Sequence, residues 1–152
     1  MPAKRYVAVV GPGEATAAQD AAAEDVGFHL AEAGAIVVCG GLGGVMAAAC
    51  RGARSAGGLT VGLLPGTDRT AANEWVEVVI PTGLGELRNG LVVRAADVVI
   101  AVGGAYGTLS EIALALKTGV PVVGLSTWPI DGIERADSAS AAVARALALA
   151  RV

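Results

Sequence analysis

The sequence predicts an α/β protein built on a Rossmann-like, doubly wound parallel sheet of about six strands with helices on both faces. Six short apolar runs, rich in valine, are continuous rather than alternating, which is typical of strands buried on both faces. Segments with a helical pattern separate these runs, and such alternation indicates βαβ units. The length of 152 residues fits a single nucleotide-binding domain, residues 1–152.

The strands are predicted where valine-rich runs stand between glycine-containing loops. In chain order they are Tyr6–Val10, Ala35–Val38, Leu59–Leu64, Val76–Ile80, Val98–Val102 and Val120–Leu125. Most of the loops that follow these runs contain glycine, and several lead directly into a helix. Ligands of doubly wound sheets bind outside the carboxyl ends of the strands, so we expect the functional site in these loops.

The helices are predicted from apolar spacing and from the residues that open them. Thr16 with Gln19 three residues later has the spacing of a capping box, which opens the first helix. The last helix is rich in alanine. In chain order the predicted helices are Thr16–Ala33, Gly44–Ala56, Arg88–Ala95, Leu109–Thr118 and Ser138–Arg151.

The composition indicates a subunit interface. Hydrophobic residues make up 54% of the chain and charged residues only 16%, whereas a small domain on its own usually needs more polar cover. The predicted helix Leu109–Thr118 is apolar on more than one side, and a helix of this kind is buried on two sides. We therefore expect a homodimer or homotetramer.

Charge and cysteine usage exclude several classes of function. A net charge of −3 and a pI of about 5.1 disfavour nucleic-acid binding. Cys39 and Cys50 have no CxxC spacing and the chain has one histidine, so we expect neither a metal site nor a resident cofactor. The first apolar run is too short for a signal peptide and none reaches a membrane span. We expect a cytoplasmic protein that does not bind membranes.

The loop after the first strand reads GPGEAT and resembles the dinucleotide fingerprint G-x-G-x-x-G. Thr16 stands in place of the third glycine, and Cys39 followed by glycine stands where an acidic residue would hold a ribose. Two physical parts of the fingerprint are therefore absent, which argues against a nicotinamide-dependent dehydrogenase. Gly11 and Gly13 remain candidates for contact with a phosphate.

The loop after the second strand reads CGGLGGVM and leaves two interpretations open. Its four glycines would let a ligand approach the backbone, or they would let the following helix pack tightly on the sheet; they are Gly40, Gly41, Gly43 and Gly44. Both functions demand a missing side chain.

The segment GGAYGTLSE, at Gly103–Glu111, also has two interpretations. Glycines before a helix N-terminus, with exposed N–H groups and the Thr108 hydroxyl, form an anion site. The same spacing is that of a capping box, with Thr108 at the N-cap and Glu111 three residues later.

GGAYGTLSE resembles the Pro-Gly-Gly-x-Gly-Thr-x-x-Glu signature of the LONELY GUY family, long mislabelled as lysine decarboxylases. Its members are cytokinin riboside 5'-monophosphate phosphoribohydrolases with a Rossmann-like fold, usually dimeric. GGLGGVM, at Gly40–Met46, is similar to the first glycine cluster of that family, and Arg88 has the spacing of its arginine. The resemblance runs from Tyr6 to about Leu125.

Several residues depart from the family pattern. Gly103 replaces the signature proline and Ala105 its second glycine, while Glu86 and Asn89 replace the histidine and lysine beside the arginine. The whole pattern is closer to a branch of small bacterial proteins that is similar to molybdenum cofactor carrier proteins. In those carriers the glycine loops hold a phosphorylated pterin and no reaction is needed.

The resemblance implies a site for a small phosphorylated ligand, either a nucleoside monophosphate or a pterin. In an enzyme that hydrolyses the N-glycosidic bond of a nucleoside 5'-monophosphate, Glu111 would stabilise the oxocarbenium-like state or activate water. Arg88 would hold the phosphate or the sugar with its planar donors. In a carrier or a sensor of such a ligand, Glu111 would only cap the helix or contact the ligand. The candidate catalytic residues are Arg88 and Glu111; the candidate ligand-binding residues are Gly11, Gly13, Gly41, Gly43, Gly44, Met46, Gly103, Gly104, Tyr106, Gly107 and Thr108.

Overall fold

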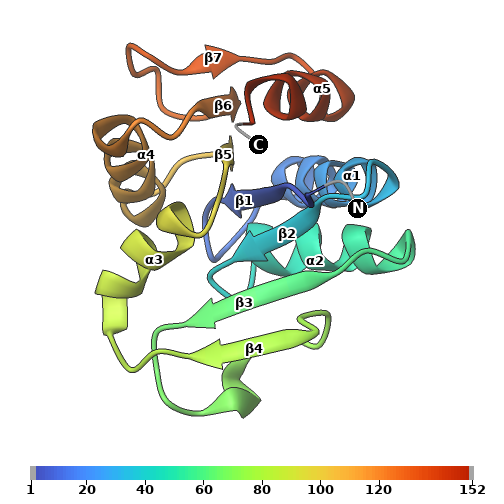
Figure 1. The fold of residues 1–152 in the computed structure, drawn as a ribbon. Helices are drawn as coiled ribbons and strands as arrows, with labels where there is room; N and C mark the ends of the chain where they lie inside the picture. Colours follow the sequence, from blue (N-terminus) through green and yellow to red (C-terminus); the bar gives the residue numbers. More distant parts are fainter. Residues whose placement is uncertain (1–2, 151–152) are drawn as a thin grey trace.

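The computed structural model describes residues 3–150 and has the predicted α/β architecture (Figure 1). Its sheet has seven parallel strands in the order β4-β3-β2-β1-β5-β6-β7. Six of them correspond to the predicted runs: β1 (Tyr6–Val10), β2 (Ile36–Cys39), β3 (Thr60–Leu64), β4 (Val78–Pro81), β5 (Val98–Val102) and β6 (Val122–Leu125). The seventh, β7 (Glu134–Arg135), escapes prediction because two charged residues form no apolar run.

Within residues 3–150, five α-helices cover the two faces of the sheet, so the predicted double winding is confirmed. One face carries α1 (Ala17–Glu32), α2 (Val45–Ser55) and α5 (Ala139–Leu149), and the other carries α3 (Arg88–Arg94) and α4 (Tyr106–Thr118), as Figure 1 shows. Two short 3-10 helices, η1 (Arg69–Ala71) and η2 (Gly85–Leu87), lie in loops. The predicted last helix extends to Arg151, which lies outside the described residues.

The helices α1 and α2 touch each other backbone to backbone. A Cβ atom added at Gly27 would lie 1.9 Å from the carbonyl oxygen of Ala49, and one added at Gly52 would lie 1.9 Å from that of Glu24. Only glycine permits this approach. No helix within residues 3–150 is long and apolar enough to cross a membrane.

The strand order reverses between β1 and β5. The chain runs outward from β1 through β2 and β3 to β4, then returns to place β5 on the other side of β1. The loops that leave the carboxyl ends of β1 and β5 therefore diverge to opposite sides, and a crevice opens between them.

The N-terminus of α1 is capped as predicted. The Thr16 Oγ1 atom accepts a hydrogen bond from the Gln19 N–H group at 3.1 Å, and the Gln19 side chain accepts one from the Thr16 N–H group at 3.0 Å. Both helix-end donors are thereby satisfied within the helix.

The N-terminus of α4 is different, and the capping-box interpretation of Thr108 and Glu111 is wrong. The helix begins at Tyr106 rather than Leu109, and its N-cap, Ala105, has no side chain that can cap. The chain turns at Gly103 with a φ of +69°, and Trp128 Nε1 donates to the Ala105 carbonyl oxygen at 3.0 Å. This contact fixes the start of α4 and joins positions 23 residues apart.

Candidate functional site

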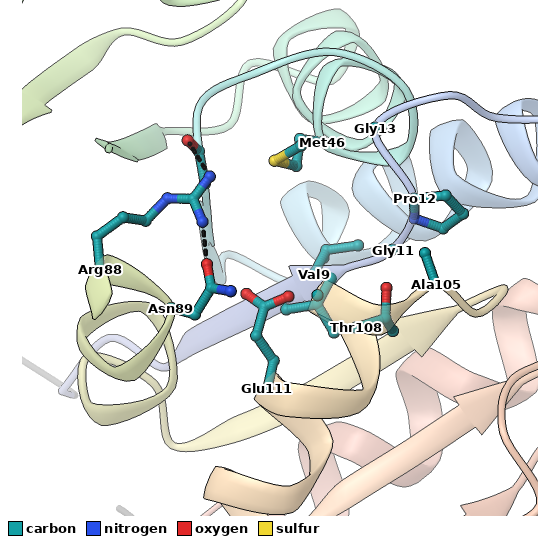
Figure 2. A pocket seen from close by; sticks show the side chains of 13 residues that line it. Val9, Gly11, Pro12, Gly13, Met46, Arg88, Asn89, Ala105, Thr108 and Glu111 are labelled. Carbon is teal, nitrogen blue, oxygen red and sulfur yellow. Dashed lines mark hydrogen bonds between the residues drawn. The ribbon is translucent and has the colours of Figure 1, made fainter. Parts of the chain in front are cut away.

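A cavity of about 170 Å³, hereafter the first cavity, opens where the strand order reverses (Figure 2). Its walls come from the end of β1, the loops after β1 and β2, and the helices α2, α3 and α4. The lining residues are Val9, Val10, Gly11, Pro12, Gly13, Gly40, Met46, Arg88, Asn89, Ala105, Gly107, Thr108 and Glu111.

Buried polar side chains are concentrated in the first cavity. Among residues 3–150, five polar or charged residues are buried, and four of them line it: Arg88, Asn89, Thr108 and Glu111. Burial of such groups costs free energy unless they are paired. Their concentration in one crevice at the carboxyl ends of the strands is the strongest sign of a functional site in the molecule.

The first turn of α4 forms one wall. The N–H groups of Tyr106, Gly107 and Thr108 have no partner within the helix, as at every helix N-terminus. The Thr108 Oγ1 atom is buried and has no hydrogen-bond partner among the described residues, a situation that costs about 1–3 kcal/mol. A Cβ atom at Gly107 would approach no neighbour closer than 4.0 Å. This wall is suited to an anion, which the helix dipole also favours.

Glu111 lies one turn further along α4, with its carboxylate directed into the first cavity (Figure 2). It is only 8% exposed. Burial raises its pKa from 4.5 to about 7, although the positive charge of Arg88 opposes the shift. The carboxyl group therefore changes protonation near neutral pH, as a general acid or base requires.

Arg88 is buried and is held by hydrogen bonds to the protein; it is neither a solvated side chain nor a partner of Glu86. Its Nε atom donates to the Leu63 carbonyl oxygen at 2.9 Å, and its Nη2 atom donates to that of Gly40 at 3.4 Å. A Cβ atom at Gly40 would lie 2.7 Å from Nη2, so the missing side chain makes room for the guanidinium. Most of the planar donor fork is thus engaged before any ligand arrives.

Asn89 is a site residue that the sequence analysis missed. Its Oδ1 atom accepts a hydrogen bond from Arg88 Nη1, so its amide nitrogen is turned toward the first cavity and Glu111 (Figure 2). The sequence signal was present, since Asn89 stands beside Arg88 where the LONELY GUY signature has lysine. Pro12, Ala105 and the end of β1 were also missed as lining residues, whereas Gly40, one of the glycines considered for ligand approach, does line the first cavity.

The predicted site residues divide into two groups. Those that line the first cavity are Gly11, Gly13, Met46, Arg88, Gly107, Thr108 and Glu111. Those that lie outside its lining are Gly41, Gly43, Gly44, Gly103, Gly104 and Tyr106. Most of the second group pack closely: a Cβ atom at Gly44 would lie 2.2 Å from the Pro12 carbonyl oxygen, and one at Gly104 would lie 3.0 Å from Trp128.

Tyr106 is 85% exposed. Its ring stacks on that of Trp128, with centroids 6.4 Å apart and planes 23° from parallel. Within residues 3–150, no group of three or more His, Cys, Asp or Glu side chains is placed to hold a metal ion. Cys39 and Cys50 are buried against each other, with 3.5 Å between their sulfur atoms.

Solved structures similar to this chain include two proteins described by their relation to molybdenum cofactor. The molybdenum cofactor binding protein of the phototrophic bacterium Rippkaea orientalis has a TM-score of 0.91 and 35% identity, covering 97% of this chain and 98% of that one. The molybdenum cofactor carrier protein of Chlamydomonas reinhardtii has a TM-score of 0.88 and 36% identity, covering 96% and 98%. The resemblance to carrier proteins is therefore confirmed in structure and sequence.

Sequence comparison supports the same grouping. An uncharacterized protein of Archaeoglobus fulgidus is 44% identical over 119 residues, which is 78% of each chain. A family model described as the SLOG cluster4 family matches residues 4–150, and the chain belongs to that family. The narrower resemblance to the LONELY GUY phosphoribohydrolases stays a prediction.

Proposed function

We propose that this member of the SLOG cluster4 family binds a small phosphorylated ligand in the first cavity and is a carrier of molybdenum cofactor or a similar phosphorylated pterin. The observation that carries the proposal is Thr108, whose buried hydroxyl lacks a partner beside the unpaired N–H groups that open α4. The similarity over nearly the whole chain to proteins that carry or bind molybdenum cofactor supports the pterin class.

The phosphate would lie against the first turn of α4. Its oxygens would accept from the helix N–H groups and from the Thr108 hydroxyl. Gly13, on the facing loop, has no neighbour within 4 Å of where a Cβ atom would stand, so a ligand can approach the backbone there. Thr108 and Glu111 are three residues apart on one helix, which places their Cβ atoms about 5–6 Å apart. The group next to the phosphate, a sugar or a reduced ring, would therefore meet Glu111 and Asn89.

The test uses two threonines of the same helix. Thr108→Val removes the unpaired hydroxyl, and Thr118→Val removes a hydroxyl at the far end of α4 that donates to the Leu114 carbonyl oxygen at 2.7 Å. We expect Thr108→Val to weaken binding of pterin monophosphates or nucleoside monophosphates at least tenfold by calorimetry, and Thr118→Val to leave it unchanged. Equal affinities for all three proteins would refute the phosphate position.

The identity of the ligand is tested on the protein as purified. We expect mass spectrometry of the small molecules released on denaturation to find a phosphorylated pterin. Release of a nucleotide instead would move the proposal from pterin carrier to nucleotide binder.

Glu111 favours a second candidate function, hydrolysis of the N-glycosidic bond of a nucleoside 5'-monophosphate. The pKa of this buried carboxyl group, about 7, suits a group that activates water or stabilises an oxocarbenium-like state. Arg88 would then position Asn89 and supply positive charge, because its own donors bond to the protein. In the carrier, the same carboxyl group would only bind the ligand.

The two functions are separated by Glu111→Gln. For the enzyme, we expect wild type to release free base from nucleoside monophosphates and the variant to be about 10²–10⁴-fold slower, the usual loss for an acid–base group. Chromatography measures the released base. Asn89→Ala tests the proposed contact between Asn89 and the group next to the phosphate. Tight binding of nucleotide without base release by wild type would leave only the binding function.

We also propose that the protein assembles through α4 as a homodimer or homotetramer. Leu109, Leu114 and Leu116 are only half-buried on this helix, so part of their apolar surface is available to a second subunit. Light scattering at micromolar concentration tests this assembly, and a monomeric mass would contradict it.

A further inference from the structure

The first cavity is small for the ligand that it is proposed to bind. Pockets that bury small-molecule ligands usually measure about 300–1,000 Å³, whereas the first cavity measures about 170 Å³. A phosphate and the group attached to it fit such a volume, but a ligand that carries a second nucleoside extends out of it. The second half of such a ligand must therefore lie against a neighbouring surface.

A second cavity, of about 350 Å³, lies at the carboxyl end of β6. Its lining includes Ser126, Thr127, Trp128, Arg135 and Asp137. The two cavities share a partition, because Trp128 Nε1 donates to the carbonyl oxygen of Ala105, a residue of the first cavity. Both open at the same edge of the sheet, where doubly wound proteins bind ligands.

Two residues of the second cavity have features that are typical of a binding site. The Thr127 Oγ1 atom is buried without a hydrogen-bond partner among the described residues, as Thr108 Oγ1 is in the first cavity. Ser126 has a φ of +53° and is the only residue other than glycine with a positive φ in the described chain. Such strain costs about 1–3 kcal/mol and is concentrated at ligand-binding positions.

The charged groups of the second cavity complement a nucleotide. Arg135 forms no ion pair within residues 3–150; its neighbour Glu134 is paired with Arg145 instead, at 2.8 Å. An unpaired guanidinium suits a phosphate. Asp137 offers a carboxylate, the group that holds ribose hydroxyls in dinucleotide-binding folds. Trp128 offers the apolar surface that a base requires.

We propose that the second cavity is a subsite for the nucleoside half of a dinucleotide, whose other, phosphorylated half occupies the first cavity. Arg135 binds the bridging diphosphate, Asp137 binds the ribose and Trp128 contacts the base. The assignment of the first half rests on the proposed function, whereas the second cavity stands on its own residues.

The experiment compares guanosine monophosphate with diguanosine diphosphate, two guanosines joined through their 5' positions by a diphosphate. We expect calorimetry to give the dinucleotide at least tenfold higher affinity for wild type. Arg135→Ala and Thr127→Val should remove this gain and leave the affinity for the mononucleotide unchanged. The matched control is Arg69→Ala, which removes an equal charge at η1, after β3, with β2, β1 and β5 between it and the second cavity.

Fluorescence gives a second readout at the partition. In a Trp75→Phe background, Trp128 is the only tryptophan, and we expect the dinucleotide to change its emission more than the mononucleotide does. Equal affinities for the two ligands, or a gain that survives Arg135→Ala, would overturn the second subsite alone. Binding of the dinucleotide through Arg135 without any binding of the mononucleotide would support the second cavity and count against the first. Binding of neither would overturn the second subsite, whereas the first cavity is tested separately by pterin monophosphates and Thr108→Val.

Discussion

The N-termini of α1 and α4 have the same sequence pattern but different roles in the structure. In α1, Thr16 and Gln19 exchange hydrogen bonds with the backbone and close the helix. In α4, Thr108 and Glu111 have the same spacing, but both lie inside the helix and line the first cavity. The spacing of a capping box is therefore not enough to identify one. What decides is the residue at which the helix begins.

The start of each helix has a different physical origin. Thr16 is extended, with φ and ψ of −68° and 164°, so its side chain can reach back to the helix. In α4 the extended residue is Ala105, which has no polar side chain. Because the protein provides no cap, the N–H groups and the Thr108 hydroxyl at this end remain available to a ligand.

The largest expected difference between the two helix ends is in how the free energy of unfolding depends on pH. Glu111 has a pKa of about 7 in the folded protein against 4.5 when solvated, so the folded state binds the proton more tightly. The protonated carboxyl group of Glu111 therefore contributes to the free energy of unfolding. This contribution is fully present below pH 4.5 and is lost as the pH rises through 7. The loss amounts to about 3 kcal/mol in the unliganded protein.

Urea denaturation between pH 5 and 8 measures this effect, with Glu111→Gln as the comparison. The variant cannot ionise, so its stability should fall less over this range than that of wild type. Gln19→Ala at the capped end should lower stability by a constant amount and leave the pH dependence unchanged. Parallel curves for wild type and Glu111→Gln would contradict the raised pKa.

The second prediction concerns Gly107. Its position is open toward the first cavity, so Gly107→Val should fit the fold, and valine is a better helix former than glycine. The added methyl groups would occupy the space of the phosphate. We expect affinity for a phosphorylated ligand to fall at least tenfold, about 1.4 kcal/mol, while the melting temperature does not fall. A variant that binds like wild type would show that the anion lies elsewhere.

The two helix ends also show how much of the fold and of the candidate site could be predicted from the sequence. The strands and the double winding were accessible because valine-rich runs and helical segments alternate plainly. Arg88, Thr108 and Glu111 were accessible through the resemblance. The start of α4 was not, because it depends on Trp128, which is distant in sequence. The orientation of the Asn89 amide was not, because it depends on a hydrogen bond from Arg88.

The role of each glycine could not be predicted from the sequence either. Gly44 and Gly107 both belong to glycine-rich segments at the start of a helix. A Cβ atom at Gly44 would meet the Pro12 carbonyl oxygen at 2.2 Å, whereas one at Gly107 would meet nothing closer than 4.0 Å. A missing side chain serves close packing in the first case and leaves open space in the second. The sequence records only that the side chain is missing.

The third prediction concerns the capped end. Thr16→Ala removes the oxygen that accepts from the Gln19 N–H group, and loss of such a cap typically costs about 1 kcal/mol. We expect this decrease in the free energy of unfolding, measured by urea denaturation, with ligand affinity within about twofold of wild type. A tenfold loss of affinity would mean that the α1 end also belongs to the binding site.

The smallest effect is expected from Thr108→Val in the absence of ligand, and its sign is informative. The substitution exchanges a buried hydroxyl without a partner for a methyl group, and threonine and valine have similar helix propensities. Because no hydrogen bond is lost and a desolvated polar group is removed, the free energy of unfolding should stay the same or rise by up to about 1 kcal/mol. The two variants should therefore have opposite effects. Thr16→Ala should lower stability and leave ligand affinity unchanged, whereas Thr108→Val should leave stability unchanged and weaken ligand binding. A Thr108→Val protein destabilised by 1 kcal/mol or more would mean that the hydroxyl has a structural partner, such as a bound water, and that the two helix ends differ less than their geometry indicates.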